Sequence, residues 1–120
     1  MKQLDVRELR ALCASPTAAP LPLLLDVREP WEFAHAAIRL EGVQTLHIPM
    51  NEVPQRLPDI AAARGSESEP PQPIVCICHH GVRSAQVVAF LERQGIDPVY
   101  NLAGGIEAWS TEVDAGVPRY

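Results

Sequence analysis

The residues from Cys78 to Ser84, CHHGVRS in one-letter code, combine a nucleophile with hydrogen-bond donors and a positive charge. A short apolar run, Ile74 to Ile77, precedes them and is typical of a buried strand. Apolar residues at helical spacing follow them as far as Gln94, and Gly95 is expected to end that helix in a left-handed conformation. The cysteine is therefore expected in a tight loop between a strand and the N-terminus of a helix. Unpaired N–H groups and the helix dipole attract anions there and favour the thiolate, the nucleophilic form of cysteine. The pattern predicts a nucleophilic sulfur in an anion-binding loop.

Each residue of this loop has an expected part in such a site. Gly81 permits the positive φ that a loop with inward-facing amides requires. The two histidines are expected to shape and charge the entrance rather than to act as general bases, and Arg83 is expected to hold an anionic substrate. With Cys78 as the catalytic residue, the candidate substrate-binding residues are His79, His80, Gly81, Val82, Arg83 and Ser84.

Four motifs of this chain resemble those of the rhodanese family of sulfurtransferases, and they occur in the family's order. Cys78-x-x-Gly81-x-Arg83-Ser84 is similar to the family's active-site loop. The other three are Leu25-Asp26-Val27-Arg28 with Glu32-Phe33, His47-Ile48-Pro49-Met50, and the stretch from Asn101 to Trp109. The resemblance covers about residues 22 to 110. It implies a rhodanese-like fold without a cofactor, and transfer of sulfur from a thiosulfate-like donor to cyanide or a thiol through a persulfide on Cys78.

The length of the loop and the positions of the cysteines help to distinguish sulfur transfer from other functions of such a site. The spacer between Cys78 and Arg83 is residues 79–82, shorter than in related phosphatase-like loops, which disfavours a phosphatase or an arsenate-type reductase. A persulfide relay protein, loaded by another protein, would have the same sequence, whereas a non-catalytic rhodanese-like binding module usually lacks the cysteine. Zinc sites usually take their ligands as two separated pairs, so Cys76 beside the loop is not expected to complete a metal site. We expect Cys76 to pack as a small hydrophobic residue, with a disulfide to Cys78 as the other option.

The composition of the whole chain restricts its class and partners. Its 120 residues are enough for one domain, residues 1–120, with its own core. The net charge of -5 disfavours nucleic acid and anionic membranes as partners. No stretch reaches the length of a transmembrane helix, the start lacks the apolar core of a signal peptide, and three cysteines fit a reducing compartment. We expect a cytoplasmic protein that acts on a small-molecule sulfur donor and acceptor, with a protein sulfur donor as a further candidate.

Hydrophobic periodicity supplies the elements that must position the loop. Strands are predicted at residues 23–27, 44–48, 74–77 and 98–101, and helices at 4–13, 30–35, 52–64, 84–94 and from 104 onward. Their alternation predicts an α/β fold with a mostly parallel sheet and helices on both faces.

Ligands of such folds bind beyond the carboxyl ends of the strands, where polar residues gather in this chain. The residues predicted at those ends are Asp26, His47, Cys78 and Asn101. Asp26 and Arg28 are expected to support the site as a structural ion pair; an Arg28–Glu32 pair at i,i+4 is a second option, and a direct place at the site mouth a third.

Overall fold

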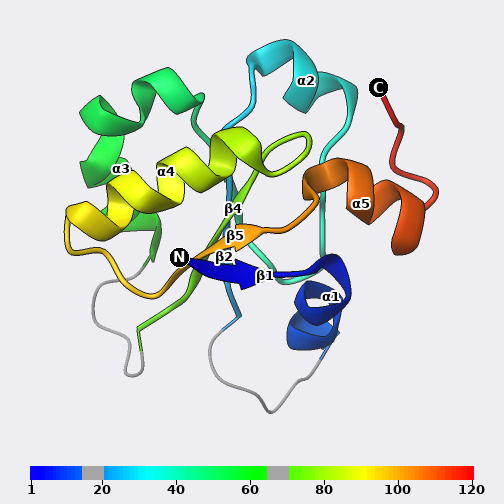
Figure 1. The fold of residues 1–120 in the computed structure, drawn as a ribbon, viewed down its shortest axis with the longest axis horizontal. Coiled ribbons are helices and arrows are strands. Elements are labelled where there is room, and N and C mark those ends of the chain that lie inside the picture. The colour runs from blue at the N-terminus through cyan, green and yellow to red at the C-terminus, as the bar shows by residue number, and fades with distance from the viewer. Residues whose placement is uncertain (15–20, 65–70) are drawn as a thin grey trace.

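The computed structural model describes residues 1–14, 21–64 and 71–120, and in these ranges a five-stranded sheet forms the centre of the molecule (Figure 1). The strands are β1 (Lys2–Leu4), β2 (Leu23–Asp26), β3 (Thr45–His47), β4 (Ile74–Ile77) and β5 (Val99–Leu102). Their order is β1-β5-β4-β2-β3, and every neighbouring pair is parallel. The predicted α/β class is confirmed, and β4, which leads into the Cys78 loop, is the central strand.

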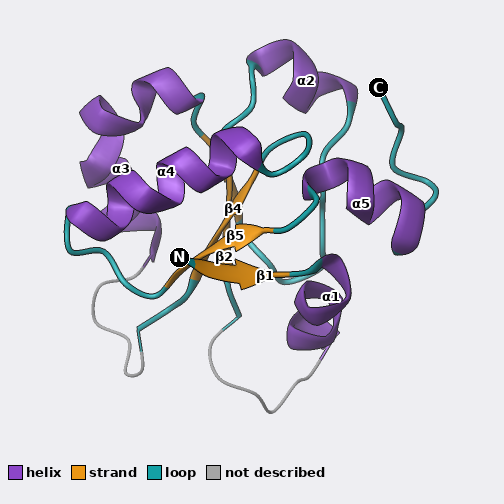
Figure 2. Cartoon of the chain, viewed as in Figure 1, coloured by secondary structure: helices purple, strands orange, loops and turns teal. Residues whose placement is uncertain are grey.

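Helices cover both faces of the sheet, as predicted (Figure 2). They are α1 (Val6–Ala14), α2 (Pro30–His35), the 3₁₀ helix η1 (Met50–Arg56), α3 (Leu57–Arg64), α4 (Val82–Arg93) and α5 (Gly105–Glu112). Side chains of η1, α3 and α4 pack on one face with Leu25 and Cys76, and side chains of α1 and α5 pack on the other with Leu24 and Val75. Trp109 of α5 is 2% exposed and belongs to the cluster on the α1 and α5 face.

The central strand β4 and its neighbour β2 are the strands buried along their whole length. Every residue of β2 and of β4 is buried, as continuous apolar runs in parallel sheets usually are. Alternation along β4 places Cys76 on the same side as Cys78, and both belong to the core cluster beneath α4. The loop after β4 therefore starts from the best-packed part of the sheet.

Strand β1 is absent from the sequence prediction, which has a helix from Leu4 onward. Residues Lys2–Leu4 instead pair with β5 at the edge of the sheet. This strand has only three residues and is mostly exposed, so alternation gives no signal there. The helix begins at Val6, after a capping box in which the Glu8 N–H donates to Asp5 Oδ1 (2.8 Å) and the Asp5 N–H to Glu8 Oε1 (2.9 Å).

The segment predicted as one helix at 52–64 is two helices. The chain forms η1 up to Arg56 and becomes α-helical at Leu57, with Pro58 in the first turn of α3, where a missing N–H costs no hydrogen bond. The sequence also predicts loops at the proline-rich stretches 15–22 and 65–73, and these lie mostly outside the described residues. Within the described ranges, no helix is long and apolar enough to span a membrane.

Helix α4 begins two residues earlier than predicted and ends one residue before the predicted bound, with Gln94 as its C-cap. Gly81 precedes it with a φ of 101°, which turns the chain from the loop directly into the helix. At the other end Gly95 has a φ of 80°, and the Ile96 N–H donates to the Leu91 carbonyl at 3.1 Å. This is the glycine-terminated helix end that the sequence predicts.

Candidate active site

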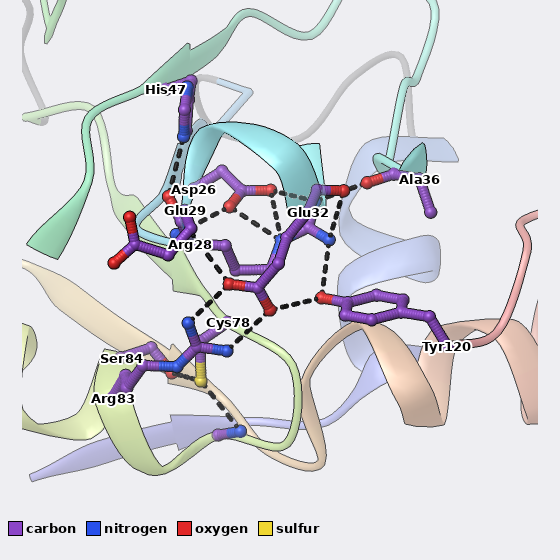
Figure 3. Close-up of polar contacts among 11 residues, drawn as sticks. Asp26, Arg28, Glu29, Glu32, Ala36, His47, Cys78, Arg83, Ser84 and Tyr120 are labelled. Carbon is purple, nitrogen blue, oxygen red and sulfur yellow. Dashed lines mark hydrogen bonds and ion pairs between the residues drawn. The ribbon is translucent and has the colours of Figure 1, made fainter. Parts of the chain in front are cut away.

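The sulfur of Cys78 lies inside the loop between β4 and α4 (Figure 3). The residue is 1% exposed, its Sγ accepts a hydrogen bond from the Gly81 N–H at 3.0 Å, and the Ser84 Oγ lies 3.2 Å from it. A Cβ on Gly81 would stand 3.3 Å from the Gly104 nitrogen, so both the positive φ and the close packing favour glycine there. The loop turns a backbone amide toward the sulfur at the start of α4.

Backbone amides at the N-terminus of α5 hydrogen-bond to this loop and fix its position. The Ile106 N–H donates to the Cys78 carbonyl at 2.9 Å, and the Glu107 N–H donates to the His79 carbonyl at 3.0 Å. Gly105 makes this approach possible, because a Cβ there would stand 2.5 Å from the Cys78 carbonyl oxygen. The otherwise unpaired amides of one helix therefore fix the loop that opens another.

Ser84 and Asn101 connect the sulfur to the neighbouring strand β5. Ser84 is completely buried, and its hydroxyl is hydrogen-bonded to Asn101 Oδ1. The Asn101 Nδ2 donates to the Gly81 carbonyl at 3.1 Å and to Gln3 Oε1 at 3.0 Å. The position of Asn101 at the carboxyl end of β5 brings it to the loop, as expected of polar residues at this edge.

The guanidinium of Arg83 is held by Glu32 of α2 (Figure 3). Its two terminal nitrogens donate to the two carboxylate oxygens at 2.7 and 2.9 Å. Glu32 is buried and also accepts hydrogen bonds from the Glu29 N–H and the Tyr120 hydroxyl, both at 2.9 Å. The Arg83 hydrogen bonds outweigh burial and lower the pKa of Glu32 to about 2, while the same bonds raise the pKa of Arg83. The charge of Arg83 is thus balanced by Glu32, and its expected contact with an anionic substrate stays a prediction.

Asp26 and Arg28 form the buried ion pair expected of supporting residues. Arg28 Nε lies 2.9 Å from Asp26 Oδ1, and its terminal nitrogen lies 2.7 Å from Oδ2. The alternative pairing of Arg28 with the Glu32 carboxylate is wrong, because Arg28 reaches only the Glu32 backbone carbonyl. A further bond from Arg28 to the Ala36 carbonyl, at 2.6 Å, ties β2 to the end of α2. The pair therefore positions the helix that carries Glu32.

His47 also serves this region as a structural contact. Its Nε2 lies 2.8 Å from the Arg28 carbonyl oxygen, and its ring stacks on Phe33 with centroids 4.4 Å apart. These contacts make His47 a hydrogen-bonded, stacked histidine at the edge of the sheet.

Tyr120 packs against the histidines of the loop. Its ring stacks on His79 with centroids 3.9 Å apart, and His79 in turn stacks on His80 at 4.0 Å. The hydroxyl donates to Glu32 and accepts a hydrogen bond from Arg28 at 2.9 Å. Burial is the main reason why the pKa of Tyr120 rises to about 12 and why the pKa of His79 is lowered. No sequence pattern marks Tyr120. Glu32 and Asn101 lie within recognised motifs, but the sequence does not predict their contacts with Arg83 and Ser84.

The remaining cysteines take no part in these contacts. Cys76 is completely buried, and burial together with the neighbouring Cys78 raises the pKa of its thiol. Cys13, Cys76 and Cys78 are all free thiols. Across the ranges 1–14, 21–64 and 71–120, no three side chains of His, Cys, Asp or Glu are grouped so as to hold a metal ion.

Comparisons with known proteins agree on the kind of domain. Residues 5–112 match the family model described as a rhodanese-like domain. The chain is 35% identical over 120 residues to the rhodanese-like/PpiC domain-containing protein 12 of Arabidopsis thaliana, a chloroplastic protein, and spans 38% of that relative's length. It is also 38% identical over 88 residues to a sulfurtransferase of Allochromatium vinosum, an alignment that covers 73% of this chain and 71% of that one.

Solved structures give the same result. A rhodanese-like domain protein from Staphylococcus aureus superposes with a TM-score of 0.67 at 29% identity, over 100% of this chain and 99% of that one. A rhodanese-related protein from Thermoplasma volcanium superposes with a TM-score of 0.72 at 25% identity, over 98% and 96% of the two chains. The family model matches residues 5–112, and the parallel sheet with its loop after the central strand agrees with that match. The chain therefore belongs to the rhodanese-like domain family.

Proposed function

We propose that the protein is a sulfurtransferase that carries sulfane sulfur on Cys78. In the first half of the reaction the Cys78 thiolate attacks the outer sulfur of thiosulfate, the S–S bond of the donor breaks, and sulfite leaves with the bonding electron pair. In the second half cyanide or a thiolate attacks the outer sulfur of the persulfide and releases the Cys78 thiolate. Thiocyanate or a new persulfide is the product, and no redox cofactor is required. Residues 1–120 act in this proposal as a single cytoplasmic domain.

The observation that carries this proposal is the environment of the Cys78 sulfur. It accepts the Gly81 N–H at 3.0 Å at the first turn of the twelve-residue helix α4, which favours negative charge on the sulfur or on an atom bonded to it. The outer sulfur of a persulfide is such an atom. Val82 and Ser84 add further amides at the helix start, and the histidines shape the entrance beside Tyr120.

Access to the sulfur supports sulfur transfer over phosphate-ester hydrolysis. Cys78 is 1% exposed, so a reacting group must enter the loop to reach it. The terminal sulfur of thiosulfate has a single covalent neighbour and fits a narrow approach better than a four-coordinate phosphorus. The short spacer from Cys78 to Arg83 is consistent with the same preference.

Loading and turnover test the proposal directly. The purified protein is incubated with thiosulfate, intact mass and peptide mass locate any added sulfur, and thiocyanate is measured after cyanide is added. We expect one added sulfur atom on Cys78 and rapid thiocyanate formation. Cys78→Ser should abolish both while the far-ultraviolet circular dichroism spectrum is unchanged; a retained rate would place the nucleophile elsewhere. Absence of any adduct would overturn thiosulfate as donor.

The part of Arg83 is tested in the same assay. Arg83→Ala should raise the KM for thiosulfate more than it lowers kcat, because the residue is proposed to hold the donor. It also leaves Glu32 buried without its main partner, so Arg83→Lys, which keeps the positive charge, is the matched comparison. An unchanged KM in both variants would contradict the assignment.

A persulfide relay is the second candidate. The apolar side chains of Trp31 and Val82 are 65% and 69% exposed, on α2 and at the start of α4, the two elements that carry the Glu32–Arg83 pair. Such side chains are suited to contact with a protein donor. Slow thiocyanate formation with thiosulfate, together with rapid sulfur loading from a protein persulfide, would favour the relay over the thiosulfate enzyme.

A further inference from the structure

The hydroxyl of Ser84 has two close partners but only one proton. Its Oγ is hydrogen-bonded to Asn101 Oδ1 and lies 3.2 Å from the Cys78 Sγ. A serine hydroxyl donates one hydrogen bond and accepts up to two. The direction of its single proton therefore depends on which partner is unable to donate.

The orientation of the Asn101 amide decides this question. Its Nδ2 lies 3.1 Å from the Gly81 carbonyl oxygen, which only accepts hydrogen bonds, so the NH₂ group must face Gly81. Gln3 Oε1, at 3.0 Å, is a second acceptor on the same side. The amide oxygen of Asn101 consequently faces Ser84 and has no proton to give. Both side chains are buried, at 3% and 0% exposure, which disfavours a competing water molecule.

We propose that Asn101 is a positioning residue that directs the Ser84 proton away from the Cys78 sulfur. In the resting thiol the S–H of Cys78 then donates to Ser84 Oγ, and Ser84 donates to Asn101 Oδ1. When the thiol loses its proton, Ser84 can stabilise the thiolate only by turning away from Asn101, which leaves a buried amide oxygen without a partner. Asn101 therefore favours the protonated sulfur over the bare thiolate.

This arrangement suits a residue that alternates between a thiol and a persulfide, and in that respect the inference rests on the proposed function. In a persulfide the sulfur bonded to Cβ carries neither proton nor full charge, because the charge lies on the outer sulfur. The Ser84–Asn101 bond then persists without penalty. The pair would selectively disfavour the intermediate bare thiolate, the form most open to oxidation.

Other titratable groups around Cys78 remain in place in every variant of the test. Cys76 of β4 and Arg83 of α4 interact with its charge directly. His79 and His80 lie in the same loop, and Glu32 and Tyr120 lie on the far side of Arg83 and His79. Any change in the protonation of Cys78 is therefore assigned to the substituted hydrogen-bond partners.

The test measures the rate of iodoacetamide alkylation at Cys78 as a function of pH, with the modified peptide identified by mass. The midpoint pH of the reactivity curve reports formation of the thiolate. In the wild-type background, Ser84→Ala should lower this midpoint, because it removes the hydroxyl that accepts the S–H of the thiol. A higher midpoint would overturn the proposal, since it would mean that Ser84 already donates to the sulfur. An unchanged midpoint would also overturn it, since Ser84 would then have no part in the protonation of Cys78.

Asn101→Leu should lower the midpoint by about one pH unit, because the released Ser84 hydroxyl donates to the thiolate. In this background Ser84→Ala should raise the midpoint again, which is the opposite of its effect in the wild type. Gln3→Met removes the second acceptor of Asn101 but keeps Gly81, so it should leave the midpoint unchanged. A shift as large as that of Asn101→Leu would overturn the assigned role of Gly81.

Two properties keep the test decisive. If Asn101→Leu fails to fold, the sign of the Ser84→Ala shift in the wild-type background decides alone. Alkylation requires no sulfur donor, so its result is independent of the thiocyanate assay. If the protein fails to transfer sulfur, the alkylation assay can therefore still confirm the positioning role of Asn101. If that role is wrong, the thiocyanate assay can still confirm sulfur transfer.

Discussion

Replacing Glu32 by glutamine removes one negative charge from the centre of the site while nearly keeping the shape of the side chain. In the folded protein this carboxylate is 3% exposed and accepts hydrogen bonds from Arg83, the Glu29 N–H and Tyr120. Each of these donors favours the ionised form. The variant should therefore be less stable than the wild type at neutral pH.

The size of the effect follows from the protonation of Glu32. Its pKa is lowered from 4.5 to about 2, chiefly by Arg83, and a shift of this size corresponds to about 3 kcal/mol. The Arg83 side chain is 35% exposed, so screening by solvent reduces the expected loss in the free energy of unfolding to about 2 kcal/mol at pH 7.

The sign of the pH dependence distinguishes charge from shape. Because the pKa is lower in the folded state, the wild type has this stabilisation above pH 4.5 and loses it as the pH falls toward 2. Glu32→Gln has no such group to protonate. The difference in the free energy of unfolding between the two proteins should fall to about half or less of its neutral value by pH 3.

Urea unfolding at pH 7, 5, 4 and 3, followed by the fluorescence of the exposed Trp31 and the buried Trp109, measures this difference. The exposed Glu41→Gln is the matched control and should alter stability little at any of these pH values. A difference between wild type and Glu32→Gln that is as large at pH 3 as at pH 7 would refute the electrostatic reasoning. It would show that the amide disturbs packing or hydrogen-bond geometry instead.

Two further predictions concern the loop and the core beside it. Gly105→Ala should lower the free energy of unfolding by about 2 kcal/mol or more, because the new Cβ would stand 2.5 Å from the Cys78 carbonyl oxygen. Gly95→Ala is the control in thermal unfolding. Gly95 has a φ of 80° but an added Cβ meets nothing within 4 Å, so only a backbone cost of about 1 kcal/mol is expected. Equal losses in the free energy of unfolding for the two variants would argue against the clash at Gly105. Cys76 should resist iodoacetamide in the native protein at pH 8 and react once urea unfolds it, because burial raises the pKa of its thiol; native labelling at the unfolded rate would disprove this.

The sequence by itself determined the features that depend on neighbouring residues. The apolar run Ile74–Ile77 is the central strand with the predicted bounds, and Gly95 ends α4 in the predicted left-handed conformation. Gly81 has the positive φ expected of the loop, and Cys78 lies where strand gives way to helix. The alternation of apolar and polar residues and the backbone conformation of a glycine depend on residues close in sequence, so the order of residues is enough to predict them.

Only the tertiary structure decided which side chains meet at the loop. Arg83 pairs with Glu32, 51 positions away in the chain, and Tyr120 reaches the same carboxylate across 88 positions. Asn101 meets Ser84 because β5 lies beside β4, and β1 is a strand only because the edge of β5 is free to pair with it. Long polar side chains can take many partners, and the choice among them depends on which elements the sheet order brings together. That order is set by packing between residues distant in sequence, which no local pattern records.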